Sequence, residues 1–253
     1  MEIKDIIKVE QQRGTASTVK ADDLIPAYTE GVQRFLRDNQ SAMGDKWVKL
    51  AGERLYRFSG KNNQGDVLGS STDMGVAIAT FCPEIPLITG QKLLELYSRA
   101  ENQNPFGQVY IDFGVQINGE PKTNSAQAEI LLKDLRDRNI QLEQGRVPNF
   151  NQLRLVADKN TGLAYRLADN AHSNNIALVS TYPFKGRVGK NGLFSAYLDR
   201  LGDWFADADY LPDSYDYGRV VCYDAKGVVQ KKSDKPESDL VASLTQDFVG
   251  RFK

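Results

Sequence analysis

The chain has 253 residues, of which 41% are hydrophobic and 26% charged, and its cations and acids nearly cancel to a formal net charge of −1. This length allows one large domain or two small ones with a real core. The charge balance excludes a strongly basic duplex-binding protein, so any nucleic-acid role must rest on a local patch. The charged N-terminus does not resemble a signal peptide, and no apolar run approaches the roughly 18 residues of a membrane span. We therefore expect a soluble cytoplasmic protein that does not enter a membrane.

The cysteine and histidine content restricts the chemistry further. Cys82 and Cys222 lie far apart without the spacing of a disulfide framework. Two buried thiols in a reducing compartment are expected, with a Cys82–Cys222 disulfide as the alternative. His172 is the single histidine of the chain, so a two-histidine metal site cannot form within one molecule. It lies in a polar stretch and is interpreted as a loop residue.

The first part of the chain predicts helices and extended segments in turn. Residues 1–21 are expected to form an N-terminal arm, and residues 22–253 a single globular domain, with a subdivision near 104–108 as the alternative. Apolar spacing predicts the elements before residue 100, which are a helix over 22–39, extended runs over 47–58 and 74–81, a polar turn region over 60–69, and a short helix capped by Thr89.

Two later regions share one order of elements. The first has a strand over 109–117, a helix after 124 and a hairpin over 153–167; the second has a strand over 176–181, a helix over 193–206 and a hairpin over 220–230. In the first strand, strict alternation places Ile111, Phe113, Val115 and Ile117 on one face and Asp112 on the other. This strand–helix–hairpin pseudo-repeat and a last helix after Pro236 predict an α+β fold, mostly antiparallel and covered by helices.

A glycine-rich basic segment precedes the predicted second helix. It carries glycines and cations but no acid, and its predicted ligand-binding residues are Lys185, Gly186, Arg187, Gly189, Lys190, Asn191 and Gly192. A strand, such a turn and a helix in this order expose backbone N–H groups and positive charge to a phosphate or another anion. Phe184 and Asn191 exclude a Walker A loop, and Val188 excludes the dinucleotide fingerprint.

Part of this segment is similar to a known nucleic-acid loop. Gly189-Lys-Asn-Gly192 followed by a helix resembles the GXXG loop of KH domains, which lets a nucleic-acid backbone approach closely. The resemblance covers about ten residues, and Pro183 with an apparent strand stands where a KH domain has a short helix. The alternative is a solvated surface loop whose glycines serve turn geometry.

Acidic residues concentrate just after the glycine-rich segment. Residues 203–217 contain five aspartates and no cation. Hard cations prefer carboxylate oxygens, so Asp207, Asp209, Asp213 and Asp216 are candidate ligands of a Ca²⁺ or Mg²⁺ ion. The spacing does not match an EF-hand, and a solvated acidic loop is the alternative.

Aromatic residues occupy the same segment. Tyr210, Tyr215 and Tyr217 do not fit the apolar face of the predicted helix and could contact a partner. Residues 204–217 are therefore a candidate surface for a homo-oligomer, in which the basic segment of one subunit meets the acidic segment of another. Asp112 could form an acid–base pair with Glu129 or Asp134, but we expect it to be solvated or paired with a cation.

These patterns favour a non-enzymatic intracellular protein without a cofactor that binds a phosphate-bearing ligand, such as nucleic acid, through the glycine-rich basic segment. One alternative is a divalent-metal-dependent enzyme that acts on a phosphorylated substrate. Another is a structural, self-assembling interaction protein. The net charge implies that any nucleic-acid binding is modest and sensitive to salt.

Overall fold

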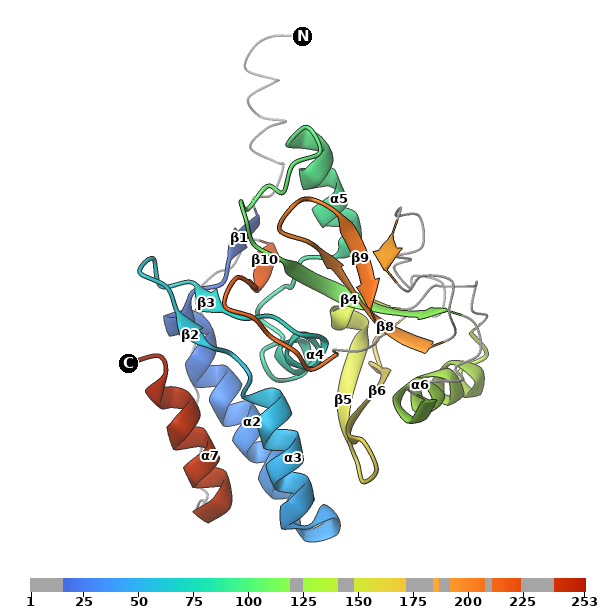
Figure 1. Ribbon diagram of the computed structural model, residues 1–253. Helices are drawn as coiled ribbons and strands as arrows, with labels where there is room; N and C mark the ends of the chain where they lie inside the picture. The colour runs from blue at the N-terminus through green and yellow to red at the C-terminus, as the bar shows by residue number, and fades with distance from the viewer. Residues whose placement is uncertain are drawn as a thin grey trace.

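A computed structural model of the chain describes residues 16–118, 125–140, 148–171, 184–186, 192–207, 211–223 and 239–253. These residues form an α+β fold, as the sequence predicts (Figure 1). The named strands pair in antiparallel fashion except for one short parallel pair. None of the described helices is long and apolar enough to cross a membrane.

Three helices pack side by side at one end of the fold: α2 (Ala21–Met43), α3 (Asp45–Leu55) and α7 (Asp239–Gly250) (Figure 1). The extended run expected over 47–58 is therefore wrong for most of its length. Trp47, Val48, Ala51 and Leu55 are all buried, and their spacing is that of one face of a helix. Gly44 separates α2 from α3 with a φ of 84°, which glycine adopts at little cost.

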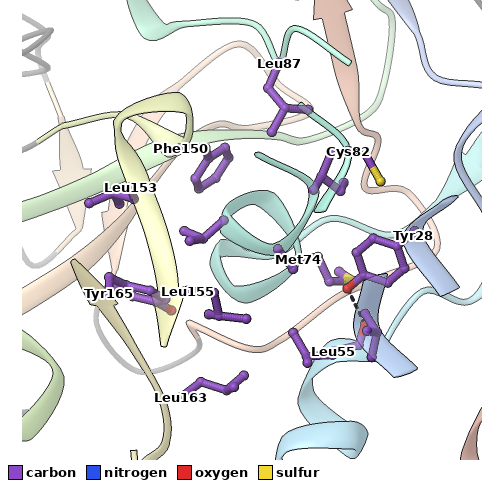
Figure 2. Close-up of a cluster of buried hydrophobic side chains, with 14 of the residues drawn as sticks. Tyr28, Leu55, Met74, Cys82, Leu87, Phe150, Leu153, Leu155, Leu163 and Tyr165 are labelled. Carbon is purple, nitrogen blue, oxygen red and sulfur yellow. Dashed lines mark hydrogen bonds between the residues drawn. The ribbon is translucent and has the colours of Figure 1, made fainter. Parts of the chain in front are cut away.

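Helix α4 (Thr72–Phe81) lies at the centre of the molecule and contacts α2, α3, β4, β5 and the short 3-10 helix η1 (Phe150–Gln152). The Ser71 side chain caps it by accepting a hydrogen bond from the Met74 backbone at 3.3 Å. Figure 2 shows buried side chains on several sides of this helix, among them Tyr28, Phe150 and Tyr165. The extended run expected over 74–81 is wrong, because a helix that is buried over most of its length has no polar face to reveal its period.

The main sheet has the strand order β4 (Ile111–Asn118), β8 (Gly192–Leu198), β9 (Trp204–Asp207) and β7 (Lys185–Gly186). The helix expected over 193–206 is wrong, because β8 and β9 form an antiparallel hairpin there. β8 is the strand between β4 and β9 and is buried along nearly its whole length, so it lacks alternation. Gly202 has a φ of 90° in the connecting turn.

The remaining strands form three two-stranded sheets. They are β1 (Ala16–Thr18) with β10 (Val221–Tyr223), β2 (Gly60–Lys61) with β3 (Val67–Leu68), and β5 (Leu153–Asp158) with β6 (Gly162–Leu167). Helix α5 (Gly90–Arg99) begins at its cap Thr89, as predicted, since this side chain accepts from the Lys92 backbone at 3.2 Å.

The predicted pseudo-repeat is formed once. β4, α6 (Ser125–Asp137) and the β5–β6 hairpin confirm the first strand–helix–hairpin unit. In the second unit, strands replace the helix, and residues 176–181 and 228–230 lie outside the described residues. Of the expected N-terminal arm, residues 16–18 pair with β10 as β1, and residues 1–15 are not described.

A buried ion pair joins α3, α4 and the β5–β6 hairpin. The Arg54 guanidinium donates to both carboxylate oxygens of Asp73, at 2.6 and 2.9 Å. Asp73 is fully buried, and it also accepts a hydrogen bond from the Tyr165 hydroxyl of β6. A further Arg54 nitrogen donates to the Thr161 carbonyl in the hairpin turn. Burial opposes the charge of Arg54, but the Asp73 carboxylate more than offsets this and raises the pKa of Arg54.

Replacing Arg54 with methionine should lower the free energy of unfolding by about 3–5 kcal/mol, because Asp73 would remain buried without its counter-ion. Urea denaturation followed by circular dichroism measures this loss. The double variant R54M/D73N removes both charges and should recover part of it. Lys133→Met, which breaks the exposed Lys133–Asp137 pair of 2.8 Å on α6, should change little. An R54M loss no larger than that of K133M would contradict the structural role of the buried pair.

Candidate functional site

A cavity of about 260 Å³ opens beside the main sheet, between β4, β8, β9 and the segment 211–217. We call it the acidic tyrosine pocket. Its lining residues are Tyr110, Asp112, Ser195, Tyr197, Asp199, Asp207, Asp213, Tyr215 and Tyr217. Among these described lining residues, four are aspartates, four are tyrosines and none is basic. The pocket therefore combines negative charge with aromatic walls.

A β-bulge turns Asp112 toward this pocket. Asp112 pairs with Tyr197, whereas Gly114 pairs with the next residue of β8, Ala196, so that Phe113 is the extra residue of β4. Bulges of this kind re-aim side chains and often occur beside functional sites. Val115 pairs with Ser195, two positions from Tyr197. Asp112 and Val115 therefore share a face although they are three residues apart.

The bulge also corrects the predicted faces of this strand. Ile111 and Phe113 pack into a small apolar cluster with Trp204, while Val115 and Ile117 belong to the main core. The four residues thus lie on two faces of the sheet, whereas strict alternation predicts one. Because a one-residue shift exchanges the faces of a strand, the bulge is sufficient to explain the difference.

Asp112 is a buried carboxylate with one oxygen unpaired. Its Oδ1 accepts a hydrogen bond from the Ser195 hydroxyl at 2.8 Å, and Ser195 in turn accepts one from the Thr72 hydroxyl of α4 at 2.8 Å. Its Oδ2 makes no hydrogen bond of ordinary geometry within the described part of the chain. Burial raises the pKa of Asp112 to about 6, against a partial opposing effect of the Ser70 and Ser195 hydroxyls.

This environment differs from the one that the sequence predicts for Asp112. A solvated or cation-paired side chain is expected, but Asp112 is only 9% exposed and has no ion pair among the described residues. Neither Glu129 nor Asp134, its proposed acid–base partners, lines the pocket. Asp134 instead accepts a hydrogen bond from the Leu167 backbone at 2.7 Å.

Tyrosine rings form one wall of the pocket. The ring of Tyr110 packs edge-on against Tyr197, Tyr215 and Tyr217, with centroid separations of 6.1, 6.3 and 5.3 Å. Tyr215 and Tyr217 stack on each other at 5.4 Å. Gly218 permits this packing, because a Cβ atom at that position would lie 2.5 Å from the Tyr110 ring. The wall is thus held by ring contacts and by close backbone approach.

The electrostatic potential inside the pocket is negative. The pKa of Tyr197 is raised to about 12, first by burial and then by the charges of Asp207, Asp112 and Asp199. Two cations approach the pocket from outside its lining. Arg57 forms an ion pair with Asp213 at 3.0 Å, and the guanidinium of Arg200 lies 5.2 Å from the centre of the Tyr217 ring.

The structure describes only part of the predicted glycine-rich site. Lys185 forms an ion pair with Asp203 at 2.7 Å, so a cation of the basic segment meets the acidic segment within one molecule. Gly186 has a φ of 90° and packs against β9, and Gly192 begins β8. Arg187, Gly189, Lys190 and Asn191 lie outside the described residues.

The element after this loop changes the physical basis of the phosphate prediction. A strand, β8, follows Gly192 where a helix is expected, so no helix N-terminus is available there to bind an anion. The same strand stands where the helix after the GXXG loop of a KH domain would begin, so the expected resemblance fails at this point. Phosphate binding by the loop itself stays a prediction.

The predicted metal ligands are only partly brought together. Asp207 and Asp213 line the acidic tyrosine pocket, Asp216 lies on the exposed turn before Gly218, and Asp209 lies outside the described residues. Within the described ranges, no three acidic, cysteine or histidine residues form a group that could hold a metal ion. A Ca²⁺ or Mg²⁺ site therefore stays a prediction that these residues do not support.

Cys82 and Cys222 are buried thiols that form no disulfide, so the disulfide alternative is not formed. Burial, followed by the charge of Glu84, raises the pKa of the Cys82 thiol to about 12, which makes it a poor nucleophile. His172 lies outside the described residues. The acidic tyrosine pocket is the cavity in which the described candidate residues Asp112, Asp207 and Asp213 come together.

Comparison of the chain with known protein families, curated proteins and solved structures gives no significant match. The function of the protein is therefore inferred from the geometry of the pocket.

Sequence analysis singles out the acidic tyrosine-rich segment but not its main partner. Asp207, Asp213, Tyr215 and Tyr217 are found from their local density, whereas Asp112 lies about a hundred residues earlier. The available signal is a lone acid between Ile111 and Phe113, followed by a glycine at which a bulge can form. That signal predicts an unusual strand position but does not identify which residues face it.

The raised pKa of Asp112 predicts a specific pH dependence of stability. Between about pH 3.8, its ordinary pKa, and pH 6, the folded protein retains a proton that the unfolded chain releases. The contribution of this group to stability therefore falls as the pH rises through that window. Asn in place of Asp112 does not titrate, so the stability of D112N relative to wild type should rise by about 2–3 kcal/mol between pH 4 and pH 7.

Urea denaturation of both proteins at several pH values measures this difference. The matched control is Asp38→Asn, which alters an exposed aspartate on α2 and should show little pH-dependent difference from wild type. If the stability difference between D112N and wild type changes as little with pH as that between D38N and wild type, Asp112 is not the buried acid that the geometry indicates.

Proposed function

We propose that this protein binds an organic cation, a protonated amine or a guanidinium, in the acidic tyrosine pocket. The observation that carries the proposal is Asp112, a lining residue of the pocket whose buried Oδ2 accepts no hydrogen bond of ordinary geometry from the described residues. The protein would act as a binding protein, in keeping with the non-enzymatic role that the sequence favours, but for a cation in place of a phosphate.

The free energy of the unpaired carboxylate supports this choice of ligand. A buried ionised carboxylate is costly unless it is paired and hydrogen-bonded. The Ser195 hydroxyl satisfies only Oδ1. An ammonium or guanidinium group would supply both the missing charge and the missing donor to Oδ2, and charge-assisted hydrogen bonds are the strong ones.

The rest of the lining favours the same ligand class. Asp199 and Asp207 add negative charge, and tyrosine rings attract cations through their electron-rich faces. An anionic ligand would be repelled by the same negative charges that raise the pKa of Tyr197. The cavity volume of about 260 Å³ lies just below the roughly 300–1,000 Å³ of drug-sized sites, which suits a single small head group.

The predicted cytoplasmic location remains part of this proposal. It is supported by the two buried thiols that form no disulfide, since a reducing compartment keeps thiols in this form. Amines and basic side chains are abundant ligands there, and nearly all of them are protonated at neutral pH.

Isothermal titration calorimetry with n-butylammonium chloride tests the proposal. Wild-type protein should bind this probe at pH 8 and lose about tenfold in affinity for each pH unit below about pH 6, because protonation of Asp112 removes the acceptor. D112N should bind at least tenfold more weakly than wild type at pH 8. D38N should bind like wild type.

Sodium butyrate, which has a similar alkyl chain and the opposite charge, should not bind at this site. Equal butylammonium affinities for wild type and D112N, or no binding to wild type at pH 8, would refute the cation site. Inorganic phosphate in a parallel titration addresses the predicted glycine-rich loop. Its binding should be independent of Asp112.

A further inference from the structure

We propose that the physiological occupant of the acidic tyrosine pocket is a lysine or arginine side chain of a partner polypeptide, next to apolar residues that cover the rim. This inference rests on the proposed cation site and adds the class of partner. It is carried by the exposed tyrosines that line the pocket and by an exposed leucine close to it in the chain.

Large hydrophobic side chains are rarely exposed in this protein. In the described part of the chain they are Leu50, Leu201, Tyr215 and Tyr217, with exposed fractions of 43%, 76%, 50% and 38%. Tyr215 and Tyr217 line the pocket itself. Leu201 lies on the turn between β8 and β9 that also carries the pocket residue Asp199, and its backbone N–H donates to that carboxylate at 3.5 Å. Two of the four therefore line one pocket, and a third, Leu201, lies two residues from its lining residue Asp199.

An exposed apolar rim around a charged pocket is typical of a protein-binding surface. Exposed apolar groups that cluster mark interaction sites, whereas isolated ones such as Leu50 need no explanation. Aromatic residues are enriched at such interfaces and dominate their binding energy. A small free amine would neutralise Asp112 but would leave Leu201 and the outer edges of both tyrosines in water.

Charge selects the partner side chain. The lining supplies four aspartates, of which Asp213 pairs with Arg57. A neutral or acidic peptide would leave the buried Asp112 oxygen without a donor. The guanidinium of Arg200, 5.2 Å from the Tyr217 ring centre, shows that this wall already holds one basic side chain of the chain itself. A basic residue with apolar neighbours satisfies the pocket and its rim together.

The size of the cavity agrees with one inserted side chain. A volume of about 260 Å³ accommodates a lysine or arginine head group with part of its aliphatic stem, but not a folded element. The remaining contacts must then come from residues on either side of the basic residue, at the level of the rim. This geometry predicts recognition of a short extended segment.

Two peptides separate this inference from the cation site. Acetyl-Leu-Lys-Leu-amide and acetyl-Gly-Lys-Gly-amide carry the same lysine, and n-butylammonium represents its side chain alone. By calorimetry at pH 8, the leucine peptide should bind at least about tenfold more tightly than the glycine peptide, because it covers the rim. The same leucine peptide with glutamine in place of lysine should not bind.

Point variants test which residues cause the difference in affinity between the two lysine peptides. Leu201→Ser should lower the affinity for the leucine peptide by about three- to tenfold. It should leave the affinity for butylammonium unchanged, because Leu201 lies outside the pocket lining. Leu50→Ser, which alters an exposed leucine on α3, is the matched control and should change neither affinity. D112N should lower the affinity for every lysine-bearing probe.

The outcomes are distinguishable. If butylammonium binds and the two lysine peptides have equal affinities, the polypeptide inference is overturned while the cation site stands. If butylammonium does not bind, both fail. If sedimentation shows a wild-type dimer that D112N dissociates, the occupant is a second copy of this chain, and the inference of a separate partner is overturned.

Discussion

Asp73 brings a negative charge into the centre of the protein, and the surrounding elements are arranged so that this charge is met. Arg54 from α3 reaches it with two hydrogen bonds, and Tyr165 from β6 adds a third. Two elements that are distant in sequence, α3 and β6, are thereby fixed against the first turn of α4, where a helix also favours negative charge. Thr72, the neighbour of Asp73, then lies where its hydroxyl reaches Ser195 at 2.8 Å. The buried pair thus positions the chain of hydroxyls that leads to Asp112.

Two buried aspartates in the same protein have opposite environments, and the contrast separates structure from function. Both Asp73 oxygens are bonded to Arg54, which is the arrangement in which a buried charge is tolerated. Asp112 has the Ser195 hydroxyl as a donor on one oxygen, whereas its other oxygen accepts no hydrogen bond of ordinary geometry from the described residues. Such a group lowers stability at neutral pH, so packing alone gives no reason for its presence. A ligand that completes the missing contact would explain why Asp112 is present, since perturbed ionisable groups concentrate at functional sites.

Local patterns in the sequence predict the α+β class, the first strand–helix–hairpin unit and the Thr89 cap, because amphipathic periods and caps depend on near neighbours. They fail at α4 and β8 for one common reason. Both elements are buried along most of their length, so their apolar runs carry no period that distinguishes a helix from a strand. Gly202, inside the predicted helix, is the one local signal against it. The pocket depends on register between β4, β8 and β9, and a single sequence does not encode register in any local pattern.

The bulge at Phe113 explains why a pocket exists where the apolar face of the sheet ends. Beyond the bulge, Val115 and Ile117 lie under α4 and join the main core. Before it, Asp112 occupies the same face, and the cover changes from a helix to the tyrosines of segment 211–217. Without the extra residue, regular alternation would turn Asp112 to the opposite face, toward the cluster around Trp204. An acid in that apolar cluster would meet neither the Ser195 hydroxyl nor the pocket. One additional residue in one strand therefore both ends the core and creates the site.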